Sequence, residues 1–248
     1  MCAMNPRLLR PTASGFNPAT ISGIVHWWDA NDAASLLFNS GFVESWTSKA
    51  GAKTVASQSV ANNRPATTTV NGKTALSFDG SNDGFDFTGT SRTDETWIVA
   101  AAQTADQSSN RTFIGESNGY GLSAAKGAAK LLDVPFGGFT DGTDRLRPQY
   151  AANPATPLGP AVMSVVRSVA GGGFVFIDGT QRTGAVGGFS SFSTSKAVTI
   201  NRIGYVNSTT WPLQGWIGEI LLYDRALSAS ERLKVERYLG KKWGITVA

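Results

Sequence analysis

The succession of short apolar segments separated by turn residues limits this chain to a β fold more than any other feature. From Ile24 onward, each segment is partly β-branched or aromatic and is bounded by Gly, Asn, Asp or Pro. We expect strands over residues 24–29, 66–70, 74–79, 84–88, 96–103, 111–116, 161–169, 173–178, 197–205 and 215–224. This spacing predicts an all-β chain, folded as an antiparallel two-sheet sandwich of jelly-roll type.

Two dipeptides predict tight hairpins within this series. Asn71-Gly72 would join strand 66–70 to strand 74–79. Asp178-Gly179 would join strand 173–178 to the segment near Arg182. Both dipeptides favour the two-residue turns in which the central residues take positive φ angles.

One helix is predicted, near the C-terminal end of the sequence. Ser228 and Glu231 have the spacing of a capping box, in which each side chain binds the other residue's backbone N–H. Val235, Leu239 and Trp243 follow at intervals of four and form an apolar stripe. We expect the helix to run to about residue 241 and to dock this stripe on the sandwich.

The strand over residues 215–224 is apolar on both faces, so we expect it to be covered on both sides. Strict alternation assigns its residues as follows: Trp216, Ile220 and Leu222 to one face, and Ile217, Leu221 and Tyr223 to the other. Glu219 shares the second face, and a buried carboxylate needs a partner. We therefore expect a structural role for Glu219, paired with Arg225 or with a backbone amide.

The scarcity of histidine and cysteine excludes several kinds of chemistry. The 248 residues include one His, His26, and one Cys, Cys2. A zinc site built from these residue types needs three or four of them. A Ser–His–Asp triad would depend entirely on His26, which we interpret as a packed strand residue. No enzymatic activity and no cofactor are expected.

The net charge of +4 does not predict a nucleic-acid partner, because it is confined to two short segments. Residues 1–10 contribute +2, and residues 225–242 contribute +4 from six basic residues and two glutamates, which leaves −2 for the remainder. No basic stripe interleaves with aromatic residues along the body of the chain. There is no apolar run of 18 residues and no apolar region of a signal peptide, so neither a membrane span nor secretion is expected.

Residues 1–23 are predicted to form an arm, followed by a domain over residues 24–248. Three prolines interrupt the arm, and it has no strand or helix periodicity. Its densest contact patch consists of Arg7, Leu8, Leu9 and Arg10. Such a segment gains order mainly by lying on a partner, so we expect this patch to dock on another protein.

A few further residues are candidates for ligands. Asp79, Asn82 and Asp83 offer oxygen atoms that calcium prefers, but the same residues are typical of tight turns, and we favour the turn. Trp211 and Tyr120 lie outside the predicted strands and are candidates for stacking on a sugar ring. For each of the two, we favour a loop anchor over a sugar contact.

Three segments carry a resemblance to a known family. They are LSFDGSNDGFDF (residues 76–87), GWIGEILLYDRALSASERLKVERYLGKKWG (residues 215–244) and IVHWWDAND (residues 24–32). These segments resemble the early hairpin, the closing strand with its terminal helix, and the opening strand of laminin-G-like domains, which have the concanavalin A-like jelly roll. The opening also resembles such domains in bacteriophage and bacterial surface proteins.

The resemblance implies a non-enzymatic structural protein of the virion surface, made in the host cytoplasm. It would decorate the head or belong to a tail or fibre, with other virion proteins, and in some cases further copies of itself, as partners. The alternative is a module that recognises a host surface glycan. A glycoside hydrolase of the same fold is the weakest alternative, because no strand carries the Glu-x-Asp-x-(x)-Glu pattern of such enzymes.

Overall fold

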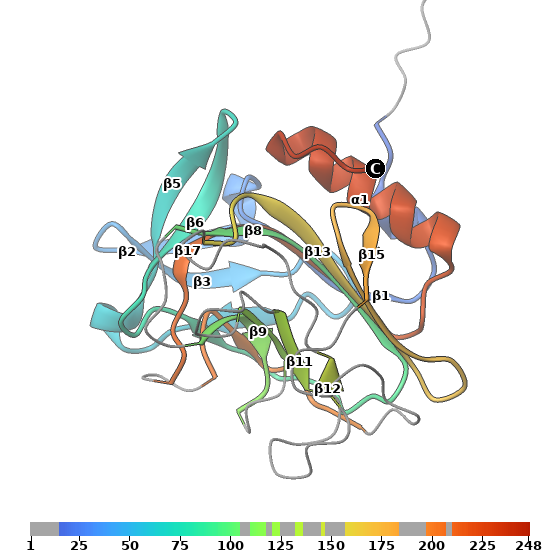
Figure 1. Cartoon of the computed structure of the whole chain (residues 1–248). Helices are drawn as coiled ribbons and strands as arrows, with labels where there is room; N and C mark the ends of the chain where they lie inside the picture. The colour runs from blue at the N-terminus through green and yellow to red at the C-terminus, as the bar shows by residue number, and fades with distance from the viewer. Residues whose placement is uncertain are drawn as a thin grey trace, which may run out of the picture.

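The computed structural model describes residues 15–104, 110–117, 121–124, 132–135, 145–146, 157–183, 197–206 and 210–248. The predicted docking patch at residues 7–10 and Tyr120 lie outside these ranges. Within them, two antiparallel sheets pack face to face, and one α-helix covers the outer face of one sheet (Figure 1). The prediction of a two-sheet sandwich with one C-terminal helix is confirmed.

The sheet that the helix covers, sheet I, has the strand order β15-β14-β13-β8-β17-β6-β5, and β1 also pairs with β17. Its strands are β1 Ile24–Asp29, β5 Ala66–Val70, β6 Lys73–Asp79, β8 Glu95–Gln103, β13 Ala161–Ser168, β14 Gly172–Ile177, β15 Thr180–Arg182 and β17 Gln214–Tyr223. The long strand β17 lies at the centre. It pairs with β8 on one side, and with β6 and then β1 along the other.

The opposite sheet, sheet II, has the order β12-β11-β10-β9-β16-β7-β4-β3-β2. Its strands are β2 Leu36–Asn39, β3 Phe42–Thr47, β4 Val55–Ser57, β7 Phe85–Asp86, β9 Arg111–Gly115, β10 Gly121–Ala124, β11 Leu132–Pro135, β12 Arg145–Leu146 and β16 Arg202–Ile203. The described ranges also contain single-turn 3₁₀ helices at Pro18–Thr20, Ala33–Ser35 and Ala61–Asn63.

Both predicted hairpins form as expected. Asn71 and Gly72 have φ angles of 48° and 68°, and they join β5 to β6. Asp178 and Gly179 have φ angles of 51° and 83°, and they join β14 to β15. The predicted strand over residues 197–205 is wrong for most of its length. Only β16 and an isolated bridge between Val198 and Arg92 form there.

The central strands of sheet I, β8, β13 and β17, are buried on both faces, which creates two separate hydrophobic cores. The core between the sheets contains Trp28, Trp46 and Trp97. The second core lies between sheet I and the helix, and it contains Trp27, Trp216, Leu221, Tyr223, Val235, Leu239 and Trp243. The helix therefore shields a sheet face that would otherwise expose several large apolar side chains to water.

A β-bulge in β17 corrects the predicted faces of this strand. The pairing of β17 with β8 slips between Ile217 and Glu219, so strict alternation fails at Gly218. Trp216 therefore shares the helix side with Leu221 and Tyr223, and Ile217 shares the inner side with Ile220 and Leu222, so the predicted grouping is wrong for Trp216 and Ile217. A Cβ atom at position 218 would lie 2.6 Å from the Trp243 ring, so the bulge also lets the helix approach closely.

The helix α1 spans Ala229–Trp243, two residues beyond the predicted end, and Gly244 terminates it with a φ angle of 74°. Its capping box forms as predicted, because the Ser228 hydroxyl accepts from the Glu231 backbone and the Glu231 carboxylate accepts from Ser228. The Glu231 carboxylate also forms an ion pair with Arg225, with 2.6 Å between Oε1 and Nη2. The Arg225 guanidinium is the main cause that lowers the pKa of Glu231 to about 2.

The last third of the predicted arm packs on the domain. Phe16 and Ile21 join the second core, and the Tyr223 hydroxyl donates to the Pro18 carbonyl at 3.3 Å. The Phe16 ring meets the Tyr238 ring edge to face, with 6.0 Å between their centroids. Residues 15–21 thus help to hold α1 on sheet I.

Candidate functional site

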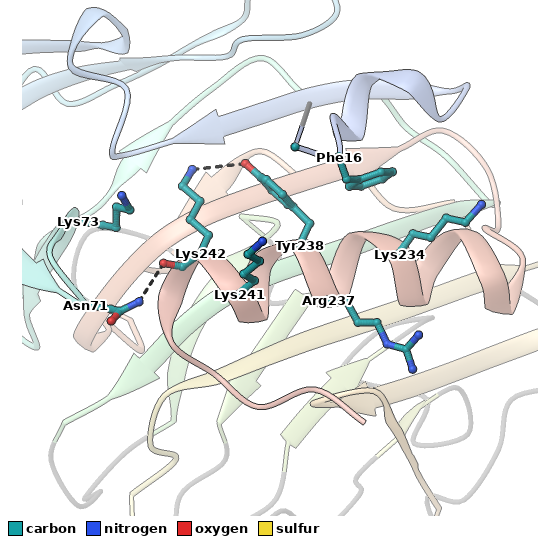
Figure 2. A pocket seen from close by; sticks show the side chains of 9 residues that line it. Phe16, Asn71, Lys73, Lys234, Arg237, Tyr238, Lys241 and Lys242 are labelled. Carbon is teal, nitrogen blue, oxygen red and sulfur yellow. Dashed lines mark hydrogen bonds between the residues drawn. The ribbon is translucent and has the colours of Figure 1, made fainter. Parts of the chain in front are cut away.

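A basic groove runs along the exposed side of α1 (Figure 2). It has a volume of about 820 Å³ and lies between Phe16, the tip of the β5–β6 hairpin and the helix. Lys234, Arg237, Tyr238 and Lys241 line it, at the spacing i, i+3, i+4 and i+7 that puts four side chains on one helix face. The opposite helix face carries the buried apolar stripe. Because the stripe packs on sheet I, the groove-lining side chains point away from the sheet.

The positive charge of this groove is largely uncompensated. Lys242 pairs with two carboxylates, and Arg237 donates to the Ala248 carbonyl. In the part of the chain that the structure describes, Lys73, Lys234 and Lys241 form no ion pair. Three ammonium groups around one hollow attract an anionic ligand and disfavour a cationic one.

Two aromatic rings give the groove an apolar wall. Phe16 lies over α1 beside Tyr238, as Figure 2 shows. Tyr238 also contacts the Trp27 ring edge to face, with 6.5 Å between centroids. The Asn71 side chain closes one end and donates to the Lys242 carbonyl at 3.2 Å. Aromatic and cationic groups in one hollow suit a ligand with both an apolar face and negative charge.

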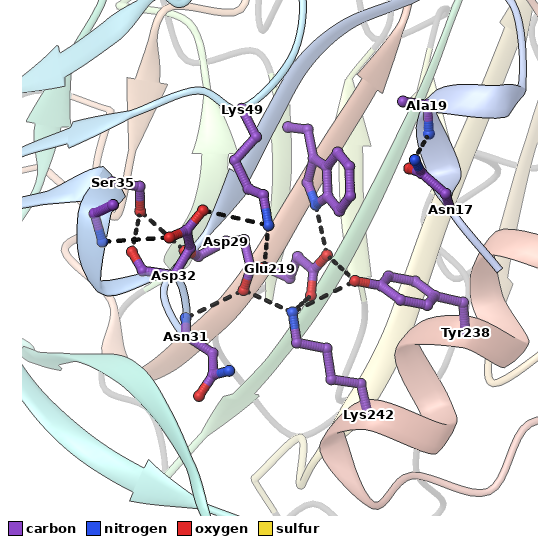
Figure 3. A network of polar contacts seen from close by, with 12 residues as sticks. Asn17, Ala19, Asp29, Asn31, Asp32, Ser35, Lys49, Glu219, Tyr238 and Lys242 are labelled. Atoms are coloured by element: carbon purple, nitrogen blue, oxygen red, sulfur yellow. Dashed lines mark hydrogen bonds and ion pairs between the residues drawn. The ribbon is translucent and has the colours of Figure 1, made fainter. Parts of the chain in front are cut away.

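A buried polar network fixes the wall of the groove from behind (Figure 3). Glu219 is fully buried, and its carboxylate accepts from Trp27 Nε1 at 2.6 Å, Tyr238 Oη at 2.9 Å, Lys242 Nζ at 2.6 Å and Trp243 Nε1 at 3.2 Å. Glu219 is buried and paired, as the sequence predicted, but the prediction of Arg225 as its partner is wrong. Glu219 lies on the same face as Leu221 and Tyr223, as expected, but there Lys242 reaches it, while Arg225 pairs with Glu231.

The same network extends to Asp29, whose carboxylate binds the ammonium groups of Lys49 and Lys242. Lys242 reaches Asp29 at 2.6 Å, and Lys49 binds the other oxygen of Asp29 at 3.0 Å. Burial raises the pKa of Glu219 most, the nearby Asp29 charge raises it further, and Lys242 opposes both effects. Lys49 also pairs with Asp32 at 3.4 Å, so three carboxylates surround two ammonium groups, and the network orders Tyr238 and Lys242 without adding positive charge to the groove.

The Asp-rich turn after β6 uses its carboxylates on its own backbone. Asp79 Oδ1 accepts from the backbone N–H of Ser81 at 2.7 Å and of Asn82 at 3.4 Å. Asp83 Oδ2 accepts from the backbone N–H of Asp79 at 2.9 Å. Among the described residues, no group of three or more His, Cys, Asp or Glu side chains gathers closely enough to hold a metal ion. This geometry is that of a closed turn.

Asp83 should make the protein less stable as the pH rises from about 4 to 7. Burial raises the pKa of Asp83 from 3.8 to about 7, so between these values the folded state binds the proton more tightly than the unfolded state. We expect Asp83→Asn, which can still accept from Asp79, to raise the free energy of unfolding at pH 8 by about 2 kcal/mol. Urea denaturation at pH 8 and pH 4 measures this.

The gain from Asp83→Asn should nearly vanish at pH 4, where both Asp83 and its replacement are neutral. Asp79→Asn is the matched control, because it changes an exposed carboxylate in the same turn. An equal gain from Asp83→Asn at both pH values would contradict the assignment of the effect to this proton.

Trp211 does not line the groove along α1. It is half-buried and has a left-handed backbone with a φ angle of 56°. Its carbonyl accepts from Thr112, and Arg111 binds the next carbonyl, that of Pro212, at 2.8 Å.

The basic residues of the groove were not predicted as a site, because a basic final helix was interpreted as a face exposed to solvent. Their i, i+3, i+7 spacing was the available signal.

No family description matches the chain, and no curated protein matches its sequence. Solved structures share its fold. A Trypanosoma rangeli sialidase in complex with 2,3-difluorosialic acid, as a covalent intermediate, aligns with a TM-score of 0.58 at 14% identity over 91% of this chain. The receptor-binding domain of botulinum neurotoxin type G aligns with a TM-score of 0.52 at 12% identity over 88% of this chain.

The chain spans only part of these neighbours, 34% of the sialidase chain and 51% of the toxin domain. At such low identity the likeness establishes the β-sandwich fold alone. Among the described residues, no helix is both long and apolar enough to cross a membrane.

Proposed function

We propose that this chain is a non-catalytic β-sandwich module that binds an acidic carbohydrate in the groove along α1. The observation that carries the proposal is the combination of the Phe16 and Tyr238 rings with the ammonium groups of Lys73, Lys234 and Lys241. Rings stack on the apolar face of a sugar, and the ammonium groups bind its carboxylates or sulfates.

The fold neighbours are compatible with this class of ligand. One is a sialidase captured with a sialic acid derivative, and another is a toxin domain whose name describes receptor binding. Both properties belong to those proteins. They support a carbohydrate ligand here only because the groove independently offers suitable chemistry.

The glutamates near the helix favour binding over hydrolysis. A glycoside hydrolase of the usual kind needs two available carboxyl groups on either side of one sugar bond. Glu219 is fully buried beneath four donors. Glu236 is also fully buried, and it accepts from Ser164 Oγ at 2.6 Å and pairs with Arg232. Glu231 is held by Arg225 and Ser228.

Binding to acidic oligosaccharides tests the proposal. We expect an oligogalacturonate or a sialylated oligosaccharide to bind in calorimetry, with affinity that falls as salt rises. The triple variant Lys73→Gln, Lys234→Gln, Lys241→Gln should weaken binding about 10- to 100-fold. The charge-matched control Lys53→Gln, Arg182→Gln, Arg202→Gln changes three cations outside the groove and should bind normally.

A second variant separates sugar recognition from simple attraction of anions. Phe16→Ala should weaken binding of the oligosaccharide more than binding of polyglutamate, because polyglutamate offers no sugar ring to stack. Equal weakening for both polymers, or tighter binding of duplex DNA than of any acidic sugar, would contradict a carbohydrate-binding role.

We also propose a setting for this module, on the surface of a virion, with residues 1–14 as the attachment to neighbouring virion proteins. The residue that follows this segment, Gly15, lies at the rim of the groove, and the rest of the predicted arm packs on the domain. The segment carries two arginines, and like charges repel, so we expect residues 1–14 to bind a surface other than the basic groove.

Two truncations test the role of the arm. Deleting residues 1–14 should leave the melting temperature unchanged and abolish incorporation into the assembly. Deleting residues 1–20 should also lower the melting temperature by several degrees, because it removes Phe16 from the second core and the Pro18 carbonyl that accepts from Tyr223. Full incorporation of the shorter truncation would show that the arm is not the attachment.

A further inference from the structure

A second pocket, of about 500 Å³, lies away from the helix groove and shares no residue with it. It is formed by the start of β1, the loop that leads into β4, and the segment between β7 and β8. Its polar lining consists of His26, Thr54, Thr88, Thr90 and Arg92. Its volume falls in the range of sites that hold one small molecule.

His26, in the wall of this pocket, has an incomplete set of hydrogen bonds. The side chain is 6% exposed, and its Nδ1 atom is buried without a partner among the described residues. The ring stacks on Trp28, with 4.7 Å between centroids, and meets Phe87 edge to face. Burying a nitrogen without a partner is costly, so native structures seldom keep one without a reason.

The other polar groups of the pocket are free to bind. In the described part of the chain, the hydroxyls of Thr54, Thr88 and Thr90 have no hydrogen-bond partner. The Arg92 side chain forms no ion pair there, and its guanidinium donates one hydrogen bond, from Nη1 to the Thr90 carbonyl at 3.1 Å. A guanidinium with free N–H groups beside three hydroxyls is suited to a carboxylate that carries hydroxyl groups.

The charge of Arg92 is not cancelled by its surroundings. Glu95 feels the Arg92 charge, but it is already paired with the buried Arg167. Burial and, second, the Arg92 charge lower the pKa of His26 to about 4. At neutral pH the histidine is therefore uncharged, and the pocket carries one net positive charge from Arg92.

We infer that this pocket is a second binding site, for a small hydroxylated carboxylate such as a single sugar acid. The Arg92 guanidinium binds the carboxylate, and the threonine hydroxyls bind hydroxyl groups of the ligand. His26 forms the inner wall. This inference does not depend on the groove along α1, because the two sites have no residue in common.

The single histidine makes the test direct. Protein prepared without a histidine tag gives one imidazole Hε1 signal in proton NMR, from His26. At pH 7 and constant ionic strength, glucuronate should shift this signal in a saturable manner, with half-saturation below about 10 mM. Glucose lacks the carboxylate and acetate lacks the hydroxyls, so both should bind at least about 10-fold more weakly.

Variants then assign the shift to the pocket. Arg92→Gln should abolish the glucuronate-induced shift, and Thr54→Val should weaken binding even if Arg92→Gln proves unstable. The triple groove variant Lys73→Gln, Lys234→Gln, Lys241→Gln should keep the shift, which separates this site from the groove. No saturation with glucuronate, an equal response to glucose, or a shift that survives both pocket variants would overturn the inference.

Discussion

Replacing Trp243 by alanine should lower the free energy of unfolding by about 3–5 kcal/mol. The indole is 1% exposed and packs against Trp216, with 6.0 Å between ring centroids, and against the backbone at Gly218. Its Nε1 also donates to Glu219. The substitution leaves a cavity between α1 and sheet I and removes one donor from a buried carboxylate. Urea denaturation, followed by circular dichroism, measures the loss.

Trp243→Phe is the matched variant, because it keeps an aromatic ring and loses only the N–H group and part of the volume. It should cost less than Trp243→Ala. An alanine variant with the denaturation midpoint of the parent would show that α1 does not pack on sheet I as described.

Replacing Glu219 by alanine should have a comparable effect, again about 3–5 kcal/mol. The change leaves Trp27 Nε1 and Trp243 Nε1 without their acceptor and removes one of the two carboxylates that hold Lys242. Buried donors that lose their acceptor, together with a weakened ion pair, cost more than the intact contacts contribute. Glu219→Gln should cost less, because its amide oxygen still accepts from some of these donors.

The double variant Glu219→Met, Lys242→Met separates pairing from packing. It removes both charges while retaining side-chain volume, so it should recover much of the stability lost in Glu219→Ala. The free energies of unfolding of Glu219→Met, Lys242→Met and the double variant, each compared with the parent, give the coupling energy between the two residues. A coupling near zero would mean that Glu219 and Lys242 do not interact in solution.

The sequence predicts well those features that depend on neighbouring residues. The capping box at Ser228 and Glu231 and the turns at Asn71-Gly72 and Asp178-Gly179 each need only local chemistry, and all three form. The short strands β2, β3 and β4 were not predicted. Ser40-Gly41, with positive φ angles at both residues, is a turn signal between β2 and β3 that the sequence did contain.

Features that depend on tertiary contacts were harder to predict. The bulge at Gly218 reverses the faces of Trp216 and Ile217, and only the close approach of Trp243 explains why a glycine stands there. The partners of Glu219 lie on β1 and α1, outside its own strand. The groove joins Phe16, Lys73 and Lys241, which are far apart in the sequence, so no local pattern could place them together.

The position of β17 within sheet I also dictates when the protein can fold during its synthesis. This central strand pairs with β1, β6 and β8, all of which leave the ribosome much earlier. Until residues 214–243 emerge, the partners of β17 have unpaired edges and the face later covered by α1 stays in water. Nascent chains stalled before residue 214 should therefore be sensitive to protease and bind chaperones, and protection should appear in one step once Trp243 has emerged.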